Sequence, residues 1–418
     1  MKEIEHITAV LEKVVFENIP FHLAIRSSLK KEKKGYDGSL LTTITSVCGG
    51  YLRHYYSLNK AINELYPSLD EKQKILPGVI LSDYLFSKKL DMEEMKKYVE
   101  KQNIDADLDK MFETHPDPMS LISSDFVIGS DEYVGLRYNL PVWLVRMWRK
   151  NCGHTLSKKL FKSLNKKDKQ ILRIDGNKIS DEEFFKKYLE YKSNDIPGLA
   201  IFPENKNPKK LSPVLNEDAI NIHAGYSYAL ESVDLDLFRG IAVYAGGSND
   251  ILDEIYVRLG SHLKMDYLCG NQKHFFEVNN KIKRYGLIDL SVYECSYEAL
   301  RTCISKPVHT FILSPENSCY QKLSEESDYF LSIKQEDLDR LINIQKTALE
   351  NASELVEDDG YLVYIVPTIC KNETSGLVRR FLKEHQNFSL EKEAQLFPFD
   401  KYQSMLYFAI LKKEIAND

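Results

Sequence analysis

Apolar residues recur three and four positions apart through the first hundred residues, which is the pattern of amphipathic helices. Proline and glycine interrupt this pattern at Pro67 and at Pro77-Gly78. The spacing predicts helices over Ile4–Val15, Thr42–Leu65, Lys72–Lys88 and Met92–Val99. We therefore expect a small all-α domain over residues 1–120.

The pattern is mixed between residues 121 and 232. A connecting segment with weak periodicity, Asn103–Ser130, leads into this part of the chain. Basic helices follow, and a short strand is predicted at Gln170–Ile174. The stretch Ile196–Pro213 is rich in proline and asparagine, as loops are. This composition favours a compact α+β middle domain over residues 121–232.

Strands and helices alternate from residue 233 to the end of the chain. The apolar run Ile241–Ala245 stops at Gly246-Gly247, and a helical pattern with apolar residues four apart follows. Further strands are predicted at Leu263–Leu268, Leu290–Glu294, Thr310–Leu313, Tyr361–Val366 and Gln403–Leu411, and helices at Gln272–Tyr285, Gln335–Val356 and Leu377–Glu384. This alternation predicts an α/β domain with a doubly wound, mostly parallel sheet over residues 233–418.

The Gly246-Gly247 turn is the first place to look for a ligand. The first strand-to-helix turn of such a domain is where a nucleotide-like molecule normally contacts backbone N–H groups. The sequence therefore offers Gly246, Gly247 and Ser248 as candidate cofactor residues. A Gly-Gly pair is also common in turns without a ligand, and both interpretations stay open at this point.

Composition indicates an ordinary globular chain. Its 418 residues, 43% hydrophobic and 28% charged, suit two or three domains. No apolar run reaches the roughly 20 residues that a bilayer span needs, and the N-terminus has no signal-peptide pattern. We therefore expect a cytoplasmic protein that does not contact membranes. The seven cysteines lack CxxC or Cys/His ligand spacing, which predicts free thiols and no metal site.

One segment is strongly basic although the whole chain has a net charge of −6. Ten Lys/Arg residues and a single acid lie between Arg146 and Arg173. Such a segment is either a solvated helix face or a surface for a polyanion. The candidate phosphate contacts are Arg146, Arg149, Lys150, Lys158, Lys162, Lys167 and Arg173.

Five phrases give the chain a resemblance to a known family. They are LRYNLPVWLVRMWRKNCG (Leu136–Gly153), ILRIDGNKIS (Ile171–Ser180), HAGYSYALES (His223–Ser232), IQKTALENASELVEDDGYLVYIV (Ile344–Val366) and YQSMLYFAILKK (Tyr402–Lys413). In order and spacing they resemble the Sun/Fmu (RsmB/NOP-type) bacterial 16S rRNA cytosine-C5 methyltransferases. That resemblance implies a NusB-like helical domain, a small RNA-binding domain and a Rossmann-like S-adenosylmethionine domain.

The resemblance implies S-adenosyl-L-methionine as cofactor. The family's donor loop, DLCAAPGGKT, corresponds to VYAGGSND (Val243–Asp250), which keeps the two glycines. The ribose-binding acid corresponds to Cys269, and the acid after the third strand to Glu294 or Cys295. A thiol cannot accept both ribose hydroxyls as a carboxylate does. Glu294 is then the one cofactor acid that is kept.

The two catalytic cysteines of the family are replaced. One thiolate adds to cytosine C6, and the other assists product release. Their phrases, DAPCS and TCS, correspond here to LSPENS and VPT, so Glu316 or Asn317 and Pro367 occupy the cysteine positions. The nearest thiols are Cys319 and Cys370. They lie about three residues further on, roughly 10 Å along an extended chain.

These observations predict a degenerate, non-catalytic RNA-binding homologue of the family, a pseudoenzyme that acts on rRNA or the ribosome. We expect RNA, specifically rRNA, as partner, with neither DNA nor a membrane, and a monomeric chain. Two alternatives stay open. One is an active S-adenosylmethionine-dependent RNA methyltransferase with rearranged catalytic residues, and the other is an assembly protein that acts through its helical N-terminal domain.

Overall fold

The computed structural model describes residues 2–30, 38–122, 126–164, 171–194, 196–202 and 210–415. It divides the chain into two compact units. The first consists of Met1–Ser157 and Lys322–Gln335, and the second of Lys158–Gln321 and Glu336–Asp418. The chain therefore passes from one unit to the other three times. The expected domain limits near residues 120 and 232 remain predictions.

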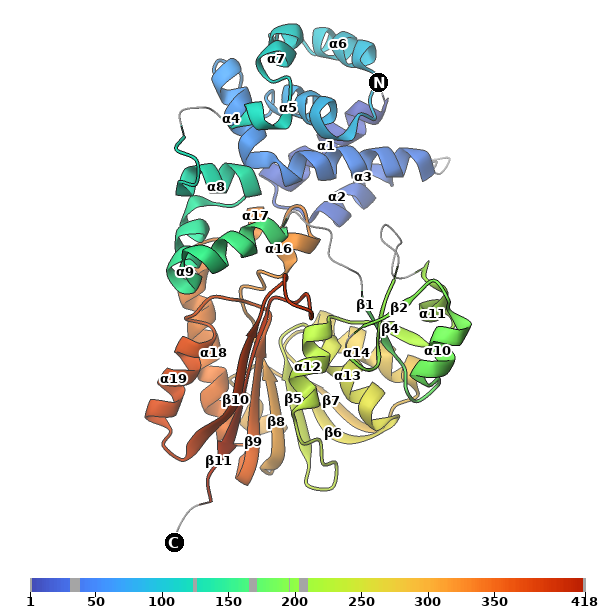
Figure 1. The fold of residues 1–418 in the computed structure, drawn as a ribbon, viewed down its shortest axis with the longest axis vertical. Coiled ribbons are helices and arrows are strands. Elements are labelled where there is room, and N and C mark those ends of the chain that lie inside the picture. Colours follow the sequence, from blue (N-terminus) through green and yellow to red (C-terminus); the bar gives the residue numbers. More distant parts are fainter. Residues whose placement is uncertain are drawn as a thin grey trace. The chain divides into compact units, whose positions relative to one another are not determined.

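The described part of the first unit is helical (Figure 1). Its elements are α1 (Lys2–Phe16), α2 (Phe21–Leu29), α3 (Gly38–Arg53), α4 (Tyr55–Leu65), α5 (Ile75–Ser82), the π-helical turn η1 (Asp83–Ser87), α6 (Met92–Lys101), α7 (Leu108–Thr114), the 3₁₀ turn η2 (Pro118–Leu121), α8 (Asp131–Tyr138), α16 (Lys322–Glu325) and α17 (Tyr329–Ser332). The single helix expected over Thr42–Leu65 is two helices, because the backbone leaves the helical conformation at His54.

A segment distant in sequence completes the core of this unit. Phe330 of α17 is buried, and its ring centroid lies 5.3 Å from those of both Tyr55 and Tyr56. The backbone N–H of Phe21 donates to Asp328 Oδ2 at 2.8 Å. Residues 322–335 therefore belong to the helical unit although strands of the second unit precede and follow them.

The basic segment forms most of α9 (Val142–Leu164), which is two helices joined at Gly153. Gly153 has φ 72°, a conformation that side chains other than glycine's rarely adopt. Residues 165–170 lie outside the described part, and with them Lys167 and the predicted strand residue Gln170. The strand predicted there begins at Ile171 in the structure.

A small antiparallel sheet follows, with the order β2-β3-β1-β4. Its strands are β1 (Ile171–Ile174), β2 (Lys192–Ser193), β3 (Leu199–Ile201) and β4 (Ala219–Asn221), with helices α10 (Asp181–Lys187) and α11 (Ser212–Leu215) beside them. Phe184 of α10 is buried against this sheet's apolar residues. The sequence pattern predicted only the first of these strands, because the other three are at most three residues long.

A seven-stranded sheet forms the rest of the second unit, with the order β10-β11-β9-β8-β5-β6-β7 (Figure 1). The strands are β5 (Ile241–Ala245), β6 (His262–Cys269), β7 (Ile288–Glu294), β8 (Val308–Ser314), β9 (Val356–Val366), β10 (Phe388–Leu396) and β11 (Leu406–Lys413). The neighbouring strands β9, β8, β5, β6 and β7 pair in parallel. The strand β11 is antiparallel to both β9 and β10. The expected mostly parallel sheet is confirmed.

Helices cover both faces of the seven-stranded sheet. Buried residues of α12 (Ala224–Glu231), α13 (Asp250–Leu259) and α14 (Gln272–Tyr285) share one apolar core with the sheet. Those of α15 (Leu300–Cys303), α18 (Asp337–Ser353) and α19 (Ser375–Glu384) share the core on the other side. This is the doubly wound architecture that the strand and helix pattern predicted. It is also the Rossmann-like domain that the family resemblance implied.

One cysteine prediction is wrong. Cys295 and Cys303 form a disulfide, although no spacing pattern paired them and all seven thiols were expected to be free. The end of β7 and the following loop bring the two residues together, with their Cα atoms 6.8 Å apart. Among the described residues, no helix is both long and apolar enough to cross a membrane.

Candidate functional site

Four residues from four strands lie side by side at the carboxyl edge of the large sheet. Ala245 pairs with Cys269 on one side and with Ser314 on the other, and Cys269 pairs with Glu294. In open α/β sheets ligands bind beyond this edge, where the strands end. The fold therefore brings the candidate cofactor residues Gly246, Gly247, Ser248, Cys269 and Glu294 to one edge.

The glycine turn after β5 is tightly packed against the loop after β8. The Gly246 N–H donates to the Ser314 carbonyl at 2.7 Å. A Cβ atom added at Gly246 would lie 2.8 Å from the backbone nitrogen of Glu316. The close approach of two backbones is a sufficient reason for glycine at this position.

Two side chains that the sequence analysis did not single out donate hydrogen bonds to backbone carbonyls of this turn. His274 is buried, and its Nδ1 donates to the Ala245 carbonyl at 3.0 Å. Burial lowers the pKa of this imidazole. Asn271 caps α14, and its Nδ2 donates to the Gly246 carbonyl at 3.1 Å. An asparagine after a strand end, three residues before a histidine, is too common a pattern to indicate such a role.

The ribose side of the site lacks the expected carboxylate. Cys269 is buried, which raises the pKa of its thiol to about 12, and the nearby Glu294 carboxylate adds to this shift. A neutral, buried thiol cannot accept two hydroxyl hydrogen bonds. Glu294 is exposed at the end of β7. One exposed acid and a buried thiol do not fit the ribose of S-adenosylmethionine.

The loops after β8 and β9 meet around a buried carboxylate, Glu373, which is 0% exposed. Its Oε1 accepts hydrogen bonds from the Ser318 N–H at 2.8 Å and from Gln345 Nε2 at 2.9 Å. Its Oε2 accepts from the Ser318 hydroxyl at 2.6 Å. The Ser318 hydroxyl also lies 2.7 Å from that of Thr368. Burying a carboxylate requires such partners.

A second layer ties the same loops to the helix α18 and the strand β9. The Tyr364 hydroxyl lies 2.9 Å from the Glu373 carbonyl and 3.1 Å from Gln345 Oε1. Gln345 Nε2 also donates to the Glu316 carbonyl at 2.9 Å. We call Glu373, Ser318, Thr368, Gln345 and Tyr364 the Glu373 cluster. It joins the two loops in which the sequence located the substituted cysteine positions.

The residues at those positions carry no thiol, and their side chains have other partners. The Glu316 carboxylate lies 3.6 Å from Arg340, and Asn317 Nδ2 donates to the Pro315 carbonyl at 2.9 Å. The remote candidate Cys370 is 2% exposed, and burial together with Glu373 raises the pKa of its thiol to about 12. The other candidate, Cys319, is partly exposed and has φ 43°.

Three of the candidate phosphate contacts are paired with acids. Arg146 lies 3.1 Å from Asp131 and 2.8 Å from Glu132, and Arg149 also pairs with Asp131. Arg173 lies 3.0 Å from Glu254, with side chains 16% and 2% exposed. The Ser227 hydroxyl donates to the same carboxylate at 2.7 Å. Arg173 therefore belongs to a hydrogen-bonded network around Glu254 in the protein interior.

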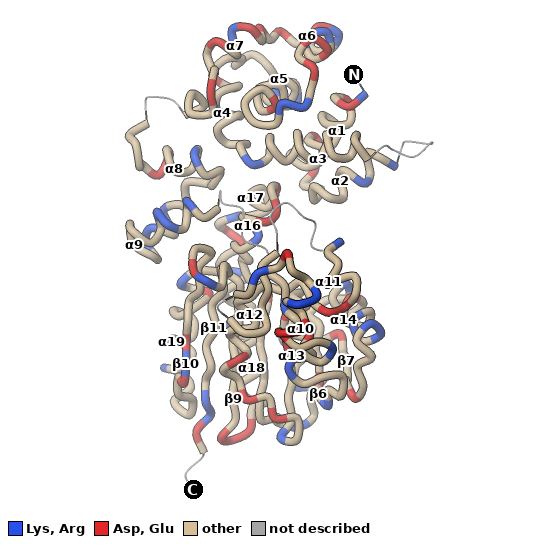
Figure 2. The backbone as a smooth tube through the Cα atoms, turned by 45° about the vertical axis from the view of Figure 1, so that its right-hand side comes forward, with Lys and Arg blue, Asp and Glu red and all other residues tan. Residues whose placement is uncertain are grey.

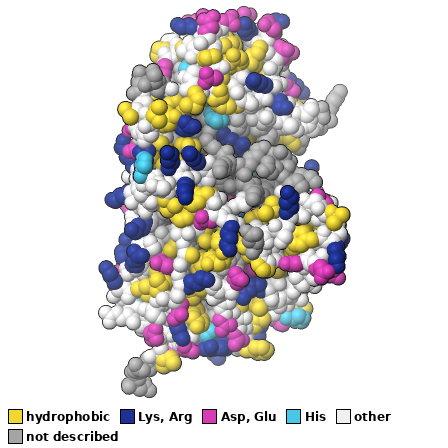
Figure 3. Space-filling view, viewed as in Figure 1, with side chains coloured by type: hydrophobic (Ala, Val, Ile, Leu, Met, Phe, Trp, Pro, Cys, Tyr) yellow, Lys and Arg dark blue, Asp and Glu magenta, His cyan; other side chains and the backbone are white. Residues whose placement is uncertain are grey.

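Three other candidates, Lys150, Lys158 and Lys162, are exposed. None of them forms an ion pair with an acid of the described residues, and α9 itself contains no acid (Figure 2). Figure 3 shows lysine and arginine side chains gathered on the surface where Figure 1 draws α9. Lys158 and Lys162 are one helical turn apart in the second unit.

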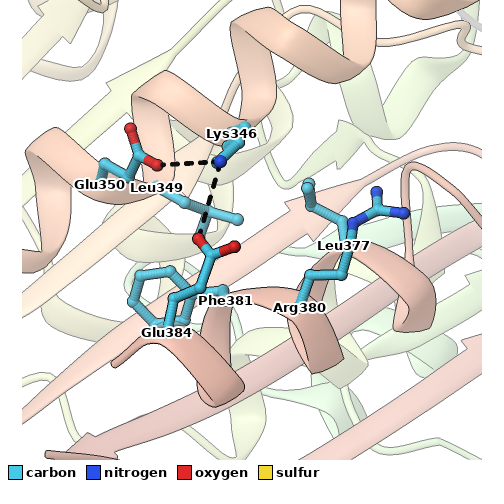
Figure 4. A pocket seen from close by; sticks show the side chains of 7 residues that line it. All are labelled: Lys346, Leu349, Glu350, Leu377, Arg380, Phe381 and Glu384. Atoms are coloured by element: carbon cyan, nitrogen blue, oxygen red, sulfur yellow. Dashed lines mark ion pairs between the residues drawn. The ribbon is translucent and has the colours of Figure 1, made fainter. Parts of the chain in front are cut away.

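A small cavity lies between α18 and α19 and is lined by none of the residues that the sequence singled out (Figure 4). Leu349, Leu377 and Phe381 line it, and Lys346 at its rim lies 3.6 Å from both Glu350 and Glu384. Its volume is about 60 Å³, room for water but not for a nucleotide. The described residues contain no group of three His, Cys, Asp or Glu side chains that could hold a metal ion.

The arrangement is that of a Rossmann-like methyltransferase fold. No protein-family model matches the chain. The protein PH0851 is similar over 99% of this chain and 98% of its own, with a TM-score of 0.76 and 18% identity. NSun6 from Pyrococcus horikoshii, solved with SFG, matches 66% of this chain and 99% of its own, with a TM-score of 0.57 and 11% identity.

A third structure, a methyltransferase homolog protein from Pyrococcus horikoshii, matches 68% of this chain and 99% of its own, with a TM-score of 0.59 and 12% identity. At these identities the likeness concerns the fold. PH0851 matches both units of the present chain, because its similarity extends over nearly the whole length.

Proposed function

We propose that this protein is a non-catalytic RNA-binding protein that keeps the architecture of RNA cytosine-C5 methyltransferases and binds rRNA. The observation that carries the loss of catalysis is the Glu373 cluster. It joins the loops after β8 and β9 through internal hydrogen bonds, in the place where the chemistry needs two thiols. Cytosine C5 is a poor nucleophile, so methylation there requires a thiolate that adds to C6.

The thiols of the second unit support this proposal. At neutral pH a thiol with a pKa of about 12 is almost fully protonated, and Cys370 and Cys269 are also buried. The buried, neutral thiol of Cys269 at the ribose position argues against binding of S-adenosylmethionine, because it cannot accept two hydroxyl hydrogen bonds. NSun6, whose fold is similar, was solved with SFG.

The exposed lysines support the RNA part of the proposal. Lys150, Lys158 and Lys162 lie in the segment that corresponds, by the resemblance of its phrases, to the family's RNA-facing part. Lysines without acidic partners are available to phosphates. The choice of rRNA rests on the resemblance to the Sun/Fmu 16S rRNA methyltransferases.

The test combines two binding measurements on the full chain. Isothermal titration with S-adenosylmethionine is expected to show no binding at millimolar ligand. Fluorescence anisotropy with an rRNA fragment is expected to show binding that weakens steeply with salt. Replacing Lys158 and Lys162 by Glu should reduce the slope of the logarithm of the binding constant against the logarithm of the salt concentration. The expected reduction is at least about 1.4, because each of the two lost phosphate contacts to a single strand contributes about 0.7.

A matched control replaces Lys273 and Lys383, exposed lysines on α14 and α19, by Glu. The control has the same charge change and should leave more of the slope intact than the α9 variant. Equal slopes in the two variants would refute the assignment of the phosphate contacts to α9. Absence of RNA binding by the unmodified chain would refute the proposed function.

Retained methyl transfer is the second candidate. It is favoured by Glu294, which stands at the carboxyl end of β7 in register with Cys269, and by the partial exposure of Cys319. Transfer of a labelled methyl group from S-adenosylmethionine to RNA, abolished by Cys319→Ala, would establish this candidate. That result would also refute the proposal that the protein is non-catalytic.

A further inference from the structure

The loop between β10 and β11 of the second unit carries two aromatic residues, Phe397 and Phe399. Figure 1 shows the course of this loop. The Asp400 N–H donates to the Phe397 carbonyl at 3.0 Å, and the Phe397 N–H donates to Asp400 Oδ2 at 3.0 Å. Pro398, at the second position of this turn, restricts its backbone further. The Asp400 carboxylate is thereby directed into the turn.

The rings of this turn are stacked and partly buried. Those of Phe397 and Phe399 have centroids 5.2 Å apart and planes 9° apart. Five residues after Phe397, Tyr402 stacks on Tyr228 of α12 with centroids 4.3 Å apart and an angle of 26°. Partly buried rings keep some surface in contact with solvent, where a flat ligand can stack.

Lysines lie over the same rings. Lys159 of α9 has its Nζ 6.0 Å from the Phe399 centroid, and Lys401 has its Nζ 5.1 Å from that of Tyr402. Both lysines are exposed. Lys159 is next to Lys158 and three residues before Lys162 in the same helix, so the Phe399 ring lies beside a lysine that neighbours the proposed phosphate contacts.

The end of the loop is fixed to the second unit. The Gly225 N–H at the start of α12 donates to Ser404 Oγ at 3.0 Å. A Cβ atom added at Gly225 would lie 2.7 Å from that of Ser404, so the loop approaches α12 as closely as glycine allows. Rings on a fixed loop lose little conformational freedom when a ligand stacks on them.

We propose that Phe397, Phe399, Tyr228, Tyr402, Lys159 and Lys401 form a lysine–aromatic surface that binds unpaired bases of single-stranded RNA. Bases stack on aromatic rings irrespective of their sequence, and nearby lysines hold the phosphates. In duplex RNA the bases are stacked on one another and cannot reach these rings. The inference rests on the proposed RNA binding and adds that the bound RNA is single-stranded.

The test compares a single strand with its duplex. An unstructured RNA of about 12 nucleotides, within the span of known single-strand sites, is titrated by anisotropy alone and annealed to its complement. Phe397→Leu and Phe399→Leu keep apolar volume but remove the rings. The double variant is expected to bind the single strand about 5- to 150-fold more weakly, with an unchanged salt slope and unchanged duplex affinity.

Two controls accompany this variant. Phe399→Tyr keeps the ring and should bind like the unmodified chain. Phe276→Leu removes a 57% exposed ring on α14 and should also leave affinity unchanged. If the chain binds RNA but the double variant binds the single strand as tightly, the surface is not used and the proposed function stands. If the unmodified chain binds neither RNA, both proposals fail.

Discussion

The Glu373 cluster and the lysine–aromatic surface use their polar groups in opposite ways. In the cluster, the carboxylate, hydroxyl and amide groups are buried and bonded to one another. On the surface, the lysine ammonium groups of Lys159 and Lys401 are exposed above rings that are partly exposed themselves. Residue types that can bind ligands or catalyse reactions therefore indicate function only when the fold does not already satisfy their hydrogen bonds and charges.

Arg173 and Lys158 show the same contrast within one basic segment. Arg173 is held by Glu254, which is 2% exposed, whereas Lys158 is exposed. A buried charge that loses its partner is costly, but an exposed lysine can be exchanged with little effect on the fold. Substitutions at the two kinds of position should therefore differ in their effect on the free energy of unfolding.

Arg173→Ala should lower the free energy of unfolding the most, by about 3–5 kcal/mol, because it leaves the buried Glu254 carboxylate without its Arg173 partner. Urea denaturation followed by circular dichroism measures this loss. Arg146→Ala is the matched control, since Arg146 is exposed and pairs with acids at the surface. It should cost less than about 1 kcal/mol. Equal losses would show that the interior role of Arg173 is wrong.

Glu373→Ala is expected to lower the free energy of unfolding by about 3 kcal/mol, because it removes the acceptor for the Ser318 N–H and for the Gln345 amide. The same denaturation experiment measures it. Glu384→Ala, at an exposed position at the end of α19, should change stability by no more than about 0.5 kcal/mol. A Glu373 variant as stable as the Glu384 variant contradicts the cluster as a structural element.

Cys370 gives a prediction about alkaline pH. Burial raises its pKa from 9.0 to about 12, so the unfolded chain loses this proton before the folded chain does. The contribution of the neutral thiol to stability is complete below pH 9 and is lost as the pH rises toward 12. At pH 10 the loss is about 1.4 kcal/mol.

The Cys370→Ala variant isolates this contribution. The stability difference between the unmodified chain and Cys370→Ala should be constant from pH 7 to about 8.5 and shift by about 1.4 kcal/mol in favour of the variant by pH 10. Urea titrations at each pH measure it. Because the other ionising groups are common to both chains, a difference independent of pH contradicts the buried, neutral state of this thiol.

The sequence predicted the sheet well where its pattern is continuous. Ile241–Ala245 is wholly apolar and ends in Gly-Gly, and it is the central strand β5. The strand β10 (Phe388–Leu396) was not predicted, because most of its residues are only partly buried and its charges break the alternation. The predicted strand Gln403–Leu411 begins instead at Leu406, after the turn that carries the aromatic rings.

The site was harder to predict because its residues interact across long sequence separations. Glu373 meets Ser318 and Gln345, which are 55 and 28 positions away, and Arg173 meets Glu254 81 positions away. In the sequence Arg173 therefore looks no different from Lys158. The pair Cys295–Cys303 was missed because eight residues of separation allow many geometries, and only the loop after β7 brings the sulfurs together.

Exchange of Lys158 and Lys162 for Glu should have the smallest effect on folding, within about 0.5 kcal/mol, since both side chains are exposed and contact no acid of the described residues. Its effect on RNA binding should nevertheless be the largest of these four variants. Denaturation and RNA anisotropy on the same preparation test both statements together. A marked loss of stability would mean that these lysines hold the fold, as Arg173 does, and would remove the contrast on which the RNA surface rests.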